Sequence, residues 1–324
     1  MTFYLIIPIY NTQKYLCECL DSLLAQSYKH FKAILINDGS SDESGKIAES
    51  YAKKDTRFIY LSQENQGVSS ARNTALDYIF NKMLIRGGQQ GENLERLNDE
   101  NNFIAFLDSD DMLESYALNH IAEILATNNC DAFISNRSFC IKDNKKQIFD
   151  YSVLKKTLEN RSLTPQELIK IAPDSKLTTL WLFAFKATIL QNARFEIDIF
   201  CGEDIVFCTF ATLNSPKIYV DSTPIYIYRL REGSLVRSKD GTNKANSHFR
   251  IASIFYEKLQ NESDKDYKRF YAYNLKQATK QTLSFHCEYK NLAFKREDLA
   301  KFMPFVSLKY RLRFYFPKIF GYLK

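Results

Sequence analysis

Three carboxylates follow a short apolar segment in the middle of the chain. The apolar residues Phe103–Leu107 lead directly into Asp108, Asp110 and Asp111. Anions this close repel one another, at about 1 kcal/mol for a close pair in a polar environment. Because residues two apart in extended backbone point the same way, Asp108 and Asp110 could share one divalent cation through their oxygens. The segment therefore predicts a Mg²⁺ or Mn²⁺ site.

The same residues also permit a purely structural interpretation. Ser109 or Asp111 could cap the start of a following helix from a solvent-exposed turn. By contrast, a metal ion held by one or two carboxylates keeps open coordination positions, which substrate phosphates usually fill. The metal interpretation thus implies a phosphate-containing ligand, and the structural one implies no ligand. The rest of the chain is needed to choose between them.

Four expected strands alternate with amphipathic helical segments, beginning at the N-terminus. The strands are expected at residues 4–10, 31–36, 58–61 and 103–107. This alternation is typical of an open, parallel α/β sheet covered by helices. Pro8 has no N–H to donate, so strand pairing should weaken there, and Thr12 is expected to cap the first helix.

Polar side chains stand at the carboxyl end of each of these strands. Asn11 follows the first strand, Asp38 the second, the 64–73 loop the third and Asp108–Asp111 the fourth. In open α/β sheets, ligands bind beyond the carboxyl ends of the strands. We therefore expect these groups to meet in one crevice.

The whole chain divides into three parts by composition. Residues 1–235 form the expected α/β domain, interrupted at 86–102 by a polar segment that we interpret as an exposed insertion. Residues 236–300 have helical character, and residues 301–324 form a basic, aromatic end that we call the C-terminal tail. Further strands are expected at 131–136, 217–220 and 225–229.

The net charge of +6 is concentrated in the C-terminal tail. The tail carries six Lys or Arg residues and no acid, whereas the rest of the chain has equal numbers of acids and bases. A neutral body with one basic end favours a local anionic surface over nucleic acid. The alternation of basic and aromatic residues is typical of segments that lie on anionic membranes. The alternative is a helix docked on the body.

Cysteine usage and hydropathy indicate a cellular compartment. The seven cysteines contain no Cys-x-x-Cys pair, which argues against a zinc site or a disulfide framework and favours a reducing environment. No basic leader precedes the first apolar segment, and no stretch of 18 apolar residues is present. We expect a cytoplasmic protein that associates peripherally with the inner face of the plasma membrane through its tail.

Five short motifs, in order, resemble those of the bacterial family 2 glycosyltransferases. They span roughly residues 3–235, and each is weak alone, but five at sensible spacing are specific. The motifs are Pro8-x-Tyr10-Asn11, Asn37-Asp38-Gly39-Ser40-Ser41-Asp42, Asn65-x-Gly67-x-x-x-Ala71-Arg72-Asn73, Phe106-Leu107-Asp108-Ser109-Asp110-Asp111 and Gly202-Glu203-Asp204. The resemblance implies a GT-A fold, a Rossmann-like, mostly parallel sheet flanked by helices, here with a C-terminal helical extension.

The resemblance also implies a site for a nucleotide-sugar donor. Asp38 would contact the uracil-like base in a pocket shared with Pro8, Tyr10 and Asn11. Arg72 would approach the diphosphate.

The other donor contacts would come from the acidic turn and a late loop. Asp108 would lie near the ribose and sugar, Asp110 would be the more direct metal ligand, and Ser109 lies between them. Arg229 and Ser234 resemble a loop that some members fold over the diphosphate.

The same resemblance assigns the chemistry to the last motif. Asp204 would act as the general base that deprotonates an acceptor hydroxyl. The implied reaction is inverting transfer of a sugar from a nucleotide-diphosphate sugar, such as a UDP-sugar, to a surface glycan or a lipid-linked oligosaccharide. Within enzymes, a retaining or nucleotidyl-transferring relative is the alternative. A non-catalytic module that binds nucleotide sugars or carbohydrates is the alternative in another class, and it predicts a lost Asp-x-Asp motif or a lost base.

Structural interpretations stand beside several of these roles. Arg72 could pair with an acid on the helix surface, and Glu203-Asp204 could simply begin a helix, where acids favour the helix dipole. For Trp181, in the apolar segment 180–185, we favour a place in the core over sugar stacking.

Overall fold

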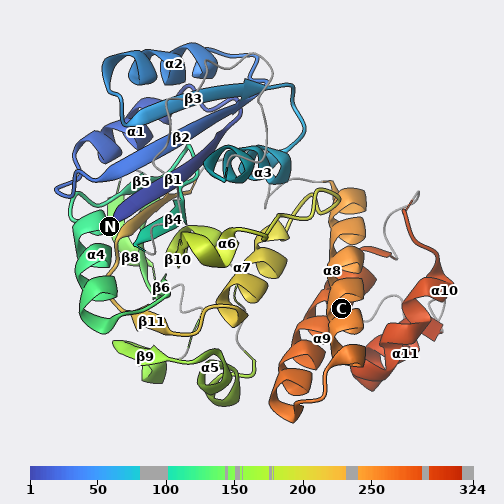
Figure 1. Cartoon of the computed structure of the whole chain (residues 1–324). Helices are drawn as coiled ribbons and strands as arrows, with labels where there is room; N and C mark the ends of the chain where they lie inside the picture. The colour runs from blue at the N-terminus through green and yellow to red at the C-terminus, as the bar shows by residue number, and fades with distance from the viewer. Residues whose placement is uncertain are drawn as a thin grey trace.

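The computed structural model describes most of the chain (Figure 1). The described residues are 1–80, 101–142, 145–149, 154, 156–174, 177, 179–230, 240–286 and 292–315. Nearly all of the expected insertion at 86–102 lies outside this set, as do Ser234 and the last nine residues of the C-terminal tail.

A mixed sheet forms the centre of the described structure. In spatial order its eight strands are β3 (Phe58–Gln63), β2 (Phe31–Asp38), β1 (Thr2–Ile9), β4 (Asn102–Phe106), β10 (Phe183–Lys186), β6 (Ala132–Ser135), β11 (Ile218–Asp221) and β9 (Arg161–Leu163). The first four are parallel, as the alternation of strands and helices predicts. β10 runs antiparallel to both of its neighbours, β4 and β6. It lies in the segment 180–185 that the sequence left open between strand and helix.

Helices cover both faces of the parallel part of the sheet. These are α1 (Leu16–Leu24), α2 (Ser44–Lys54) and α3 (Val68–Ile79). The chain moves outward from β1 to β3 and then returns to β4, so right-handed crossovers place α3 on the face opposite α1 and α2. Further along the chain, α4 (Ala117–Asn128), α5 (Pro165–Ile171), α6 (Ala187–Leu190) and α7 (Glu203–Leu213) surround the second half of the sheet.

β1 is the central strand of the parallel half and is buried from Phe3 to Ile9. Its pairing with β2 continues past Pro8, whereas its pairing with β4 ends at Ile6. The carbonyl of Ile6 accepts the N–H of Leu107, and residues two apart face the same neighbour, so the missing N–H of Pro8 faces the side where this ladder has ended. The expected weakening at Pro8 is therefore confirmed on one side of the strand.

The start of α1 differs from the expected cap. The helix begins at Leu16, and Tyr15 precedes it without a side-chain cap. The hydroxyl of Thr12 instead donates to Ser109 Oγ at 3.2 Å, and the Thr12 carbonyl accepts the N–H groups of Tyr15 and Leu16. Thr12 was therefore wrongly predicted as the helix cap, because its side chain joins two strand ends and does not close the helix.

A second, smaller sheet lies beside the first. Its strands, in spatial order, are β5 (Met112–Leu113), β12 (Tyr226–Arg229), β7 (Ser138–Lys142) and β8 (Lys145–Phe149). The sequence predicted β12 but not this sheet. β5 follows the acidic turn directly and pairs with β12, so residues 226–229 lie against that turn.

The C-terminal helices pack together beside the α/β body (Figure 1). They are α8 (Gly241–Asn261), α9 (Lys265–His286), α10 (Arg296–Leu299) and α11 (Leu308–Tyr315). Phe302, Met303 and Phe314, all within the C-terminal tail, are buried. The tail through Tyr315 therefore packs within this helical unit, as in the docked-helix alternative. Within the described residues, no helix has the length and apolarity needed to cross a bilayer.

Candidate active site

The loops after β1 and β2 are joined by side-chain bonds at the carboxyl edge of the sheet. Asn11 adopts a left-handed conformation with φ 51°, and its Oδ1 accepts the N–H of Ser41 at 2.9 Å. The Asn11 N–H in turn donates to Ser40 Oγ at 3.2 Å. Asn at this position is consistent with its tolerance of positive φ. Asn11 therefore shapes the rim of the crevice, with its amide oxygen used by the neighbouring loop.

Asp38 holds the loop that leads into α3. Its carboxylate accepts the N–H groups of Gln66 and Gly67, each at 2.9 Å, and the Nε2 of Gln63 at 2.8 Å. The residue is only 3% exposed. Gly39, beside it, has φ 68°, and a Cβ there would lie 2.7 Å from the backbone nitrogen of Asn65. Asp38 therefore supports the loop that borders the expected base pocket.

Other residues predicted to bind the donor differ in accessibility. Pro8 is buried within the sheet, whereas Tyr10 is 50% exposed at the end of β1. Ser109 is buried and accepts the hydroxyl of Thr12. Of these three residues, Tyr10 is therefore the one with a large exposed surface at the carboxyl end of β1.

Arg72 lies buried between two acidic motifs. Its Nη1 contacts Glu203 Oε1 at 2.6 Å and its Nη2 contacts Asp108 Oδ1 at 3.1 Å, while its guanidinium lies 5.3 Å from the Phe195 ring centroid. Only 5% of Arg72 is exposed. The sequence predicted a contact between Arg72 and the donor diphosphate. In the structure, the guanidinium instead bridges the Asp108 turn and the start of α7.

The last carboxylate of the acidic turn is used by the fold. Asp111 is 1% exposed and accepts the Tyr226 hydroxyl at 2.7 Å and the N–H of Arg229 at 2.8 Å. The same hydroxyl accepts the N–H of Asp108 at 3.3 Å. Burial, followed by the charges of Asp110 and Asp108, raises the pKa of Asp111 well above its usual value. Asp111 is therefore a structural residue, and Asp108 and Asp110 remain half-buried at the crevice.

Arg229 supports the backbone of the acidic turn. Its Nε donates to the Asp110 carbonyl at 3.1 Å, and its Nη2 contacts Glu18 at 2.7 Å. The guanidinium also lies 5.2 Å from the ring centroid of Tyr15. These contacts hold the backbone of the turn, and the role of Arg229 over the diphosphate stays a prediction.

Glu203 and Asp204 begin α7 after Gly202, which has φ 82°. Asp204 Oδ2 accepts the N–H of Thr179 at 2.9 Å. Burial raises the pKa of Asp204, and the Thr179 N–H and the charge of Arg72 oppose that shift. The two acids therefore differ, because Glu203 is paired with Arg72 and Asp204 is held by a backbone donor.

The acids at the crevice fit a divalent cation that is shared with phosphate. Asp108, Glu203 and Asp204 lie near the guanidinium of Arg72, and Asp110 adds its charge to that of Asp108, so carboxylates outnumber the cation among these residues. The described residues contain no group of three or more His, Cys, Asp or Glu side chains placed to hold a metal ion by themselves. Asp108 and Asp110 together supply two carboxylates, which matches a Mg²⁺ or Mn²⁺ ion completed by substrate oxygens.

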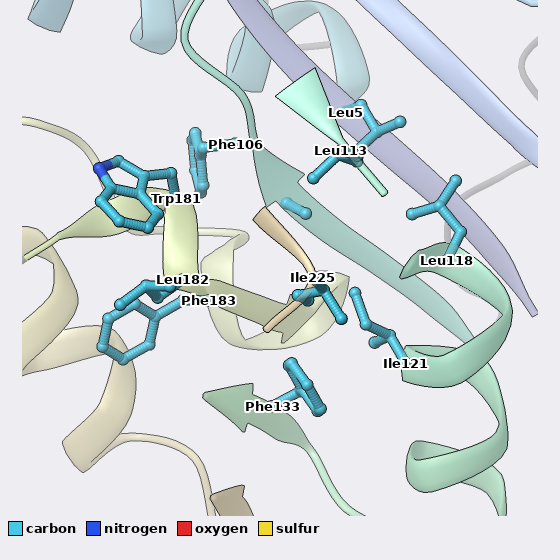
Figure 2. Close-up of a pocket in the computed structure, with 11 residues that line it drawn as sticks. Leu5, Phe106, Leu113, Leu118, Ile121, Phe133, Trp181, Leu182, Phe183 and Ile225 are labelled. Carbon is cyan, nitrogen blue, oxygen red and sulfur yellow. The ribbon is translucent and has the colours of Figure 1, made fainter. Parts of the chain in front are cut away.

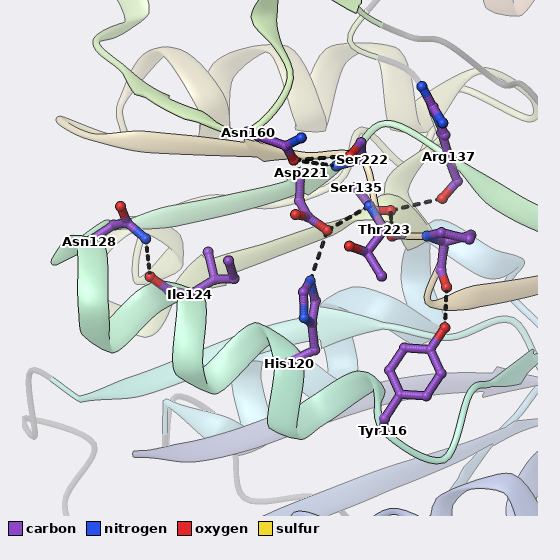
Figure 3. Close-up of polar contacts among 11 residues, drawn as sticks. Tyr116, His120, Ile124, Asn128, Ser135, Arg137, Asn160, Asp221, Ser222 and Thr223 are labelled. Carbon is purple, nitrogen blue, oxygen red and sulfur yellow. Dashed lines mark hydrogen bonds and ion pairs between the residues drawn. The ribbon is translucent and has the colours of Figure 1, made fainter.

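A set of polar contacts fixes the chain between β11 and β12 (Figure 3). His120 Nε2 and the N–H of Thr223 both contact Asp221 Oδ2 at 2.9 Å, and the Tyr116 hydroxyl donates to the Pro224 carbonyl at 2.8 Å. These contacts come from α4 and its start. They hold the segment that delivers Tyr226 to the acidic turn.

Sequence reasoning missed Tyr226 and Thr179 as parts of the site. Tyr226 lies in a predicted strand, and its alternation with Tyr228 was the available signal for two rings on one face. Nothing in the local sequence distinguishes Thr179, because its contact with Asp204 joins two residues that lie 25 positions apart in the sequence.

A family comparison identifies the chain. The family model described as glycosyl transferase family 2 matches residues 4–175, more than half of the sequence. The chain belongs to glycosyl transferase family 2. This confirms the family predicted from the five motifs.

Curated relatives of this family 2 chain are also glycosyltransferases. It is 30% identical to glycosyltransferase GlyA of Streptococcus pneumoniae over 72% of this chain and 31% of GlyA. It is 25% identical to the GalNAc(5)-diNAcBac-PP-undecaprenol beta-1,3-glucosyltransferase of Campylobacter jejuni over 94% of this chain and 92% of that enzyme. The chain thus spans about a third of GlyA and nearly all of the Campylobacter enzyme.

Solved structures of low sequence identity share the fold of this family 2 chain. A crystal structure of S. aureus TarS 1-349 in complex with UDP matches with a TM-score of 0.64 and 19% identity, covering 98% of this chain and 87% of that fragment. A mannosyltransferase from Pyrobaculum calidifontis, in complex with GDP-Man and Mn²⁺, matches with a TM-score of 0.53 and 13% identity over 98% and 87% of the two chains. The predicted GT-A fold is confirmed, with its C-terminal helices.

Substituting Arg72→Gln should destabilise the protein strongly, because it leaves the largely buried Glu203 and the half-buried Asp108 without their cation. We expect a loss of about 3–5 kcal/mol in the free energy of unfolding, measured by urea titration without divalent metal. Arg57→Gln is the matched control. It removes a partly exposed pair with Asp55 and should cost about 0–1 kcal/mol.

The loss in the free energy of unfolding caused by Arg72→Gln should also grow with pH. Burial raises the pKa of Glu203 and Arg72 lowers it, so without Arg72 the folded-state pKa lies further above the unfolded one. A raised folded-state pKa contributes stability at low pH that is lost as the pH rises through it. The deficit should therefore be larger at pH 8 than at pH 5. An equal deficit in both arginine variants would contradict the bridging role.

Proposed function

We propose that this protein is an inverting glycosyltransferase that uses a nucleotide-diphosphate sugar, with Asp204 as the general base. The observation that carries the proposal is the pairing of Arg72 with both Asp108 and Glu203. This pairing brings Asp108 of the acidic turn next to Glu203, the residue that precedes Asp204. In a donor bound over the turn, the sugar would then lie between the leaving phosphate and Asp204.

The proposed donor is a UDP-sugar. TarS, which shares the fold, has been solved with UDP and with UDP-GlcNAc. The exposed ring of Tyr10 and the loop held by Asp38 form the side of the crevice that we assign to the base. Asn11 shapes this side through its side-chain bond to the Ser41 N–H, and Pro8 through its place in β1, and we retain both as pocket residues in that sense.

A divalent cation, Mn²⁺ or Mg²⁺, is proposed at Asp110 with Asp108. When bound, it would neutralise charge on the leaving diphosphate as a Lewis acid. Arg229 keeps the turn in place through the Asp110 carbonyl, and Ser109 holds it against the β1 loop. Arg72 sets the position of Asp108 and adds positive charge nearby. We therefore assign to Arg72 and Arg229 the positioning of the acids that would surround the diphosphate.

Asp204 suits proton removal from the acceptor hydroxyl. Its pKa is raised by burial, which makes its carboxylate a stronger base than an exposed aspartate, and a backbone N–H orients it. The hydroxyl oxygen attacks the anomeric carbon as Asp204 takes its proton and the bond to the leaving phosphate oxygen breaks. In-line displacement of this kind inverts the anomeric configuration.

The proposed acceptor is a glycan or a lipid-linked oligosaccharide. The Campylobacter relative is named for an undecaprenol-linked substrate, and this supports the lipid-linked class. A catalytically silent binding module is less well supported, because Arg72 links Asp108 of the Asp-x-Asp motif to Glu203, next to the candidate base. We also propose peripheral association with an anionic membrane, in the cytoplasm, through the basic end of the C-terminal tail.

Nucleotide release from a panel of nucleotide sugars tests the activity and the metal together. Wild-type protein should release UDP in Mn²⁺ and lose activity in chelator. Asp110→Ala should lose metal-dependent UDP binding, measured by calorimetry, because it removes a ligand of the cation. Asp198→Ala, an exposed acid before α7, is the control and should keep wild-type binding. Unchanged UDP affinity of Asp110→Ala in Mn²⁺ would refute the metal assignment.

Asp204→Asn should retain donor binding but lose turnover by about 10²–10⁴-fold, because the amide cannot accept the acceptor proton. Single-turnover kinetics with a saturating donor measure this loss. Glu203→Gln is the comparison, since Glu203 is paired with Arg72 in the structure. Near-normal turnover of Asp204→Asn would exclude Asp204 as the base. Product anomer analysis separates the inverting proposal from a retaining relative.

Removal of residues 316–324, which follow α11 in the sequence, tests the membrane proposal. This segment contains Lys318 and Lys324. Each basic residue near an anionic surface contributes about 1 kcal/mol, so vesicle flotation should show weaker binding to anionic lipid at low salt. Added salt should weaken binding of the intact protein in the same way. Lys46→Gln with Lys53→Gln, on α2, controls for charge alone, and equal binding by the truncated and intact proteins would reject the proposal.

A further inference from the structure

The turn that precedes β10 contains a strained residue directed at the candidate base. Thr179 has φ 72° and ψ 66°, a left-handed conformation that is unfavourable for a β-branched residue. Its N–H donates to Asp204 Oδ2 at 2.9 Å, and its carbonyl accepts the N–H of Leu182 at 3.0 Å. The strained conformation is thus the one that aims a backbone donor at Asp204.

The residues that follow Thr179 anchor the turn by apolar packing. Leu180 and Leu182 are buried in the core. Between them, Trp181 stacks on Tyr226, with ring centroids 4.2 Å apart and planes 22° apart, and on Tyr228, at 5.7 Å and 6°. These contacts give a rigid base on which Thr179 can be held against its conformational preference.

Trp181 also borders a small apolar cavity under the sheet (Figure 2). Phe106, Leu182 and Phe183 line it with Trp181, and its volume is about 20 Å³. That volume admits about one water molecule, so the cavity is too small for a sugar. The environment of Trp181 is therefore that of a packing residue, which agrees with the preference for a core role.

The stacking partner of Trp181 contacts the donor side of the site. Tyr226 accepts the N–H of Asp108 and donates to Asp111 through one hydroxyl. Trp181 therefore touches a ring fixed to the acidic turn, and two residues earlier Thr179 binds Asp204. One aromatic pair connects the turn proposed for the metal with the proposed base.

We propose that residues 179–182 are a positioning element for Asp204, held in register with the acidic turn by the Trp181–Tyr226 stack. The Thr179 N–H fixes one carboxylate oxygen and thereby directs the other toward the acceptor hydroxyl. Other charges near Asp204 are those of Arg72, Asp108 and Glu203, and the Cys208 thiol is also close. This inference rests on the proposed function, because it assigns a task within the same reaction.

Trp181→Ala and Trp181→Phe test the anchoring stack. The alanine variant should lose about 10–100-fold in kcat, since a small displacement of a reacting group is enough for such a loss. Its donor KM and UDP affinity should stay at wild-type values, and phenylalanine should restore most of kcat. Phe249→Ala is the matched control, because it removes a comparable stack with Phe294 in the C-terminal helices. A loss of kcat in Phe249→Ala equal to that in Trp181→Ala would overturn the proposal in favour of general destabilisation.

Replacing Thr179 by its α-hydroxy analogue tests the hydrogen bond itself, because an ester has no N–H. That N–H lowers the pKa of Asp204, so its removal should raise this pKa and move the acidic limb of the kcat/KM profile to higher pH. Thr179→Gly, which keeps the N–H and favours positive φ, should shift the acidic limb less than the ester does. An ester variant with wild-type kcat and an unshifted profile overturns the positioning role.

Failure of the proposed function would look different. Wild-type protein that transfers no sugar from any nucleotide sugar would refute the function before any variant is compared. Wild-type protein that transfers sugar, together with an ester variant that is indistinguishable from it, would refute the positioning role alone.

Discussion

A single buried guanidinium lies between carboxylates from two distant segments of the chain. Arg72 pairs with Asp108 at the end of β4 and with Glu203 at the start of α7. Taking a charge out of water costs several kcal/mol, and the cost is offset only when oppositely charged partners lie close with good geometry. The two acids are likewise stabilised by this cation. The position of the proposed base therefore depends on a helix, α3, that carries neither it nor the acidic turn.

The repulsion within the acidic turn is relieved in more than one way. Asp108 pairs with Arg72, while Asp111 is buried against Tyr226 and the backbone of Arg229 with a raised pKa. Asp110 contributes its carbonyl to Arg229. The turn thus combines a structural acid with acids that remain half-buried at the crevice. A divalent cation and a diphosphate would complete the neutralisation, and this is the physical basis of the metal proposal.

The second sheet and the segments around it hold the turn from the other side. β12 pairs with β5, which follows the turn, and the contacts of Asp221 with His120 and Thr223 fix the approach to β12. Arg229 and Ser109, both predicted to bind the donor, also support the turn through protein contacts. Ligand-binding loops need such supports because an exposed loop by itself does not hold side chains in one arrangement.

The local sequence was sufficient to determine the alternating strands and helices of the parallel half and the family. Apolar periodicity and motif order are local properties, so β1 to β4, the polar strand ends and the five motifs could be read directly. Periodicity also placed β12, and composition separated the helical C-terminal region. The antiparallel position of β10 could not be read, because a buried apolar segment does not reveal the direction of its neighbours.

The tertiary structure decided which charged groups meet. Whether Arg72 contacts a phosphate or two carboxylates depends on where α7 places Glu203, and no local pattern contains that distance. Thr179 was likewise unremarkable in sequence, and its role follows from a backbone conformation stabilised by packing around Trp181. The tail shows the same division: its charge was evident from composition, whereas the burial of Phe314 depends on the surface presented by the other C-terminal helices. Composition and periodicity are properties of neighbouring residues, but ion pairs and stacked rings join residues that only the folded chain brings together.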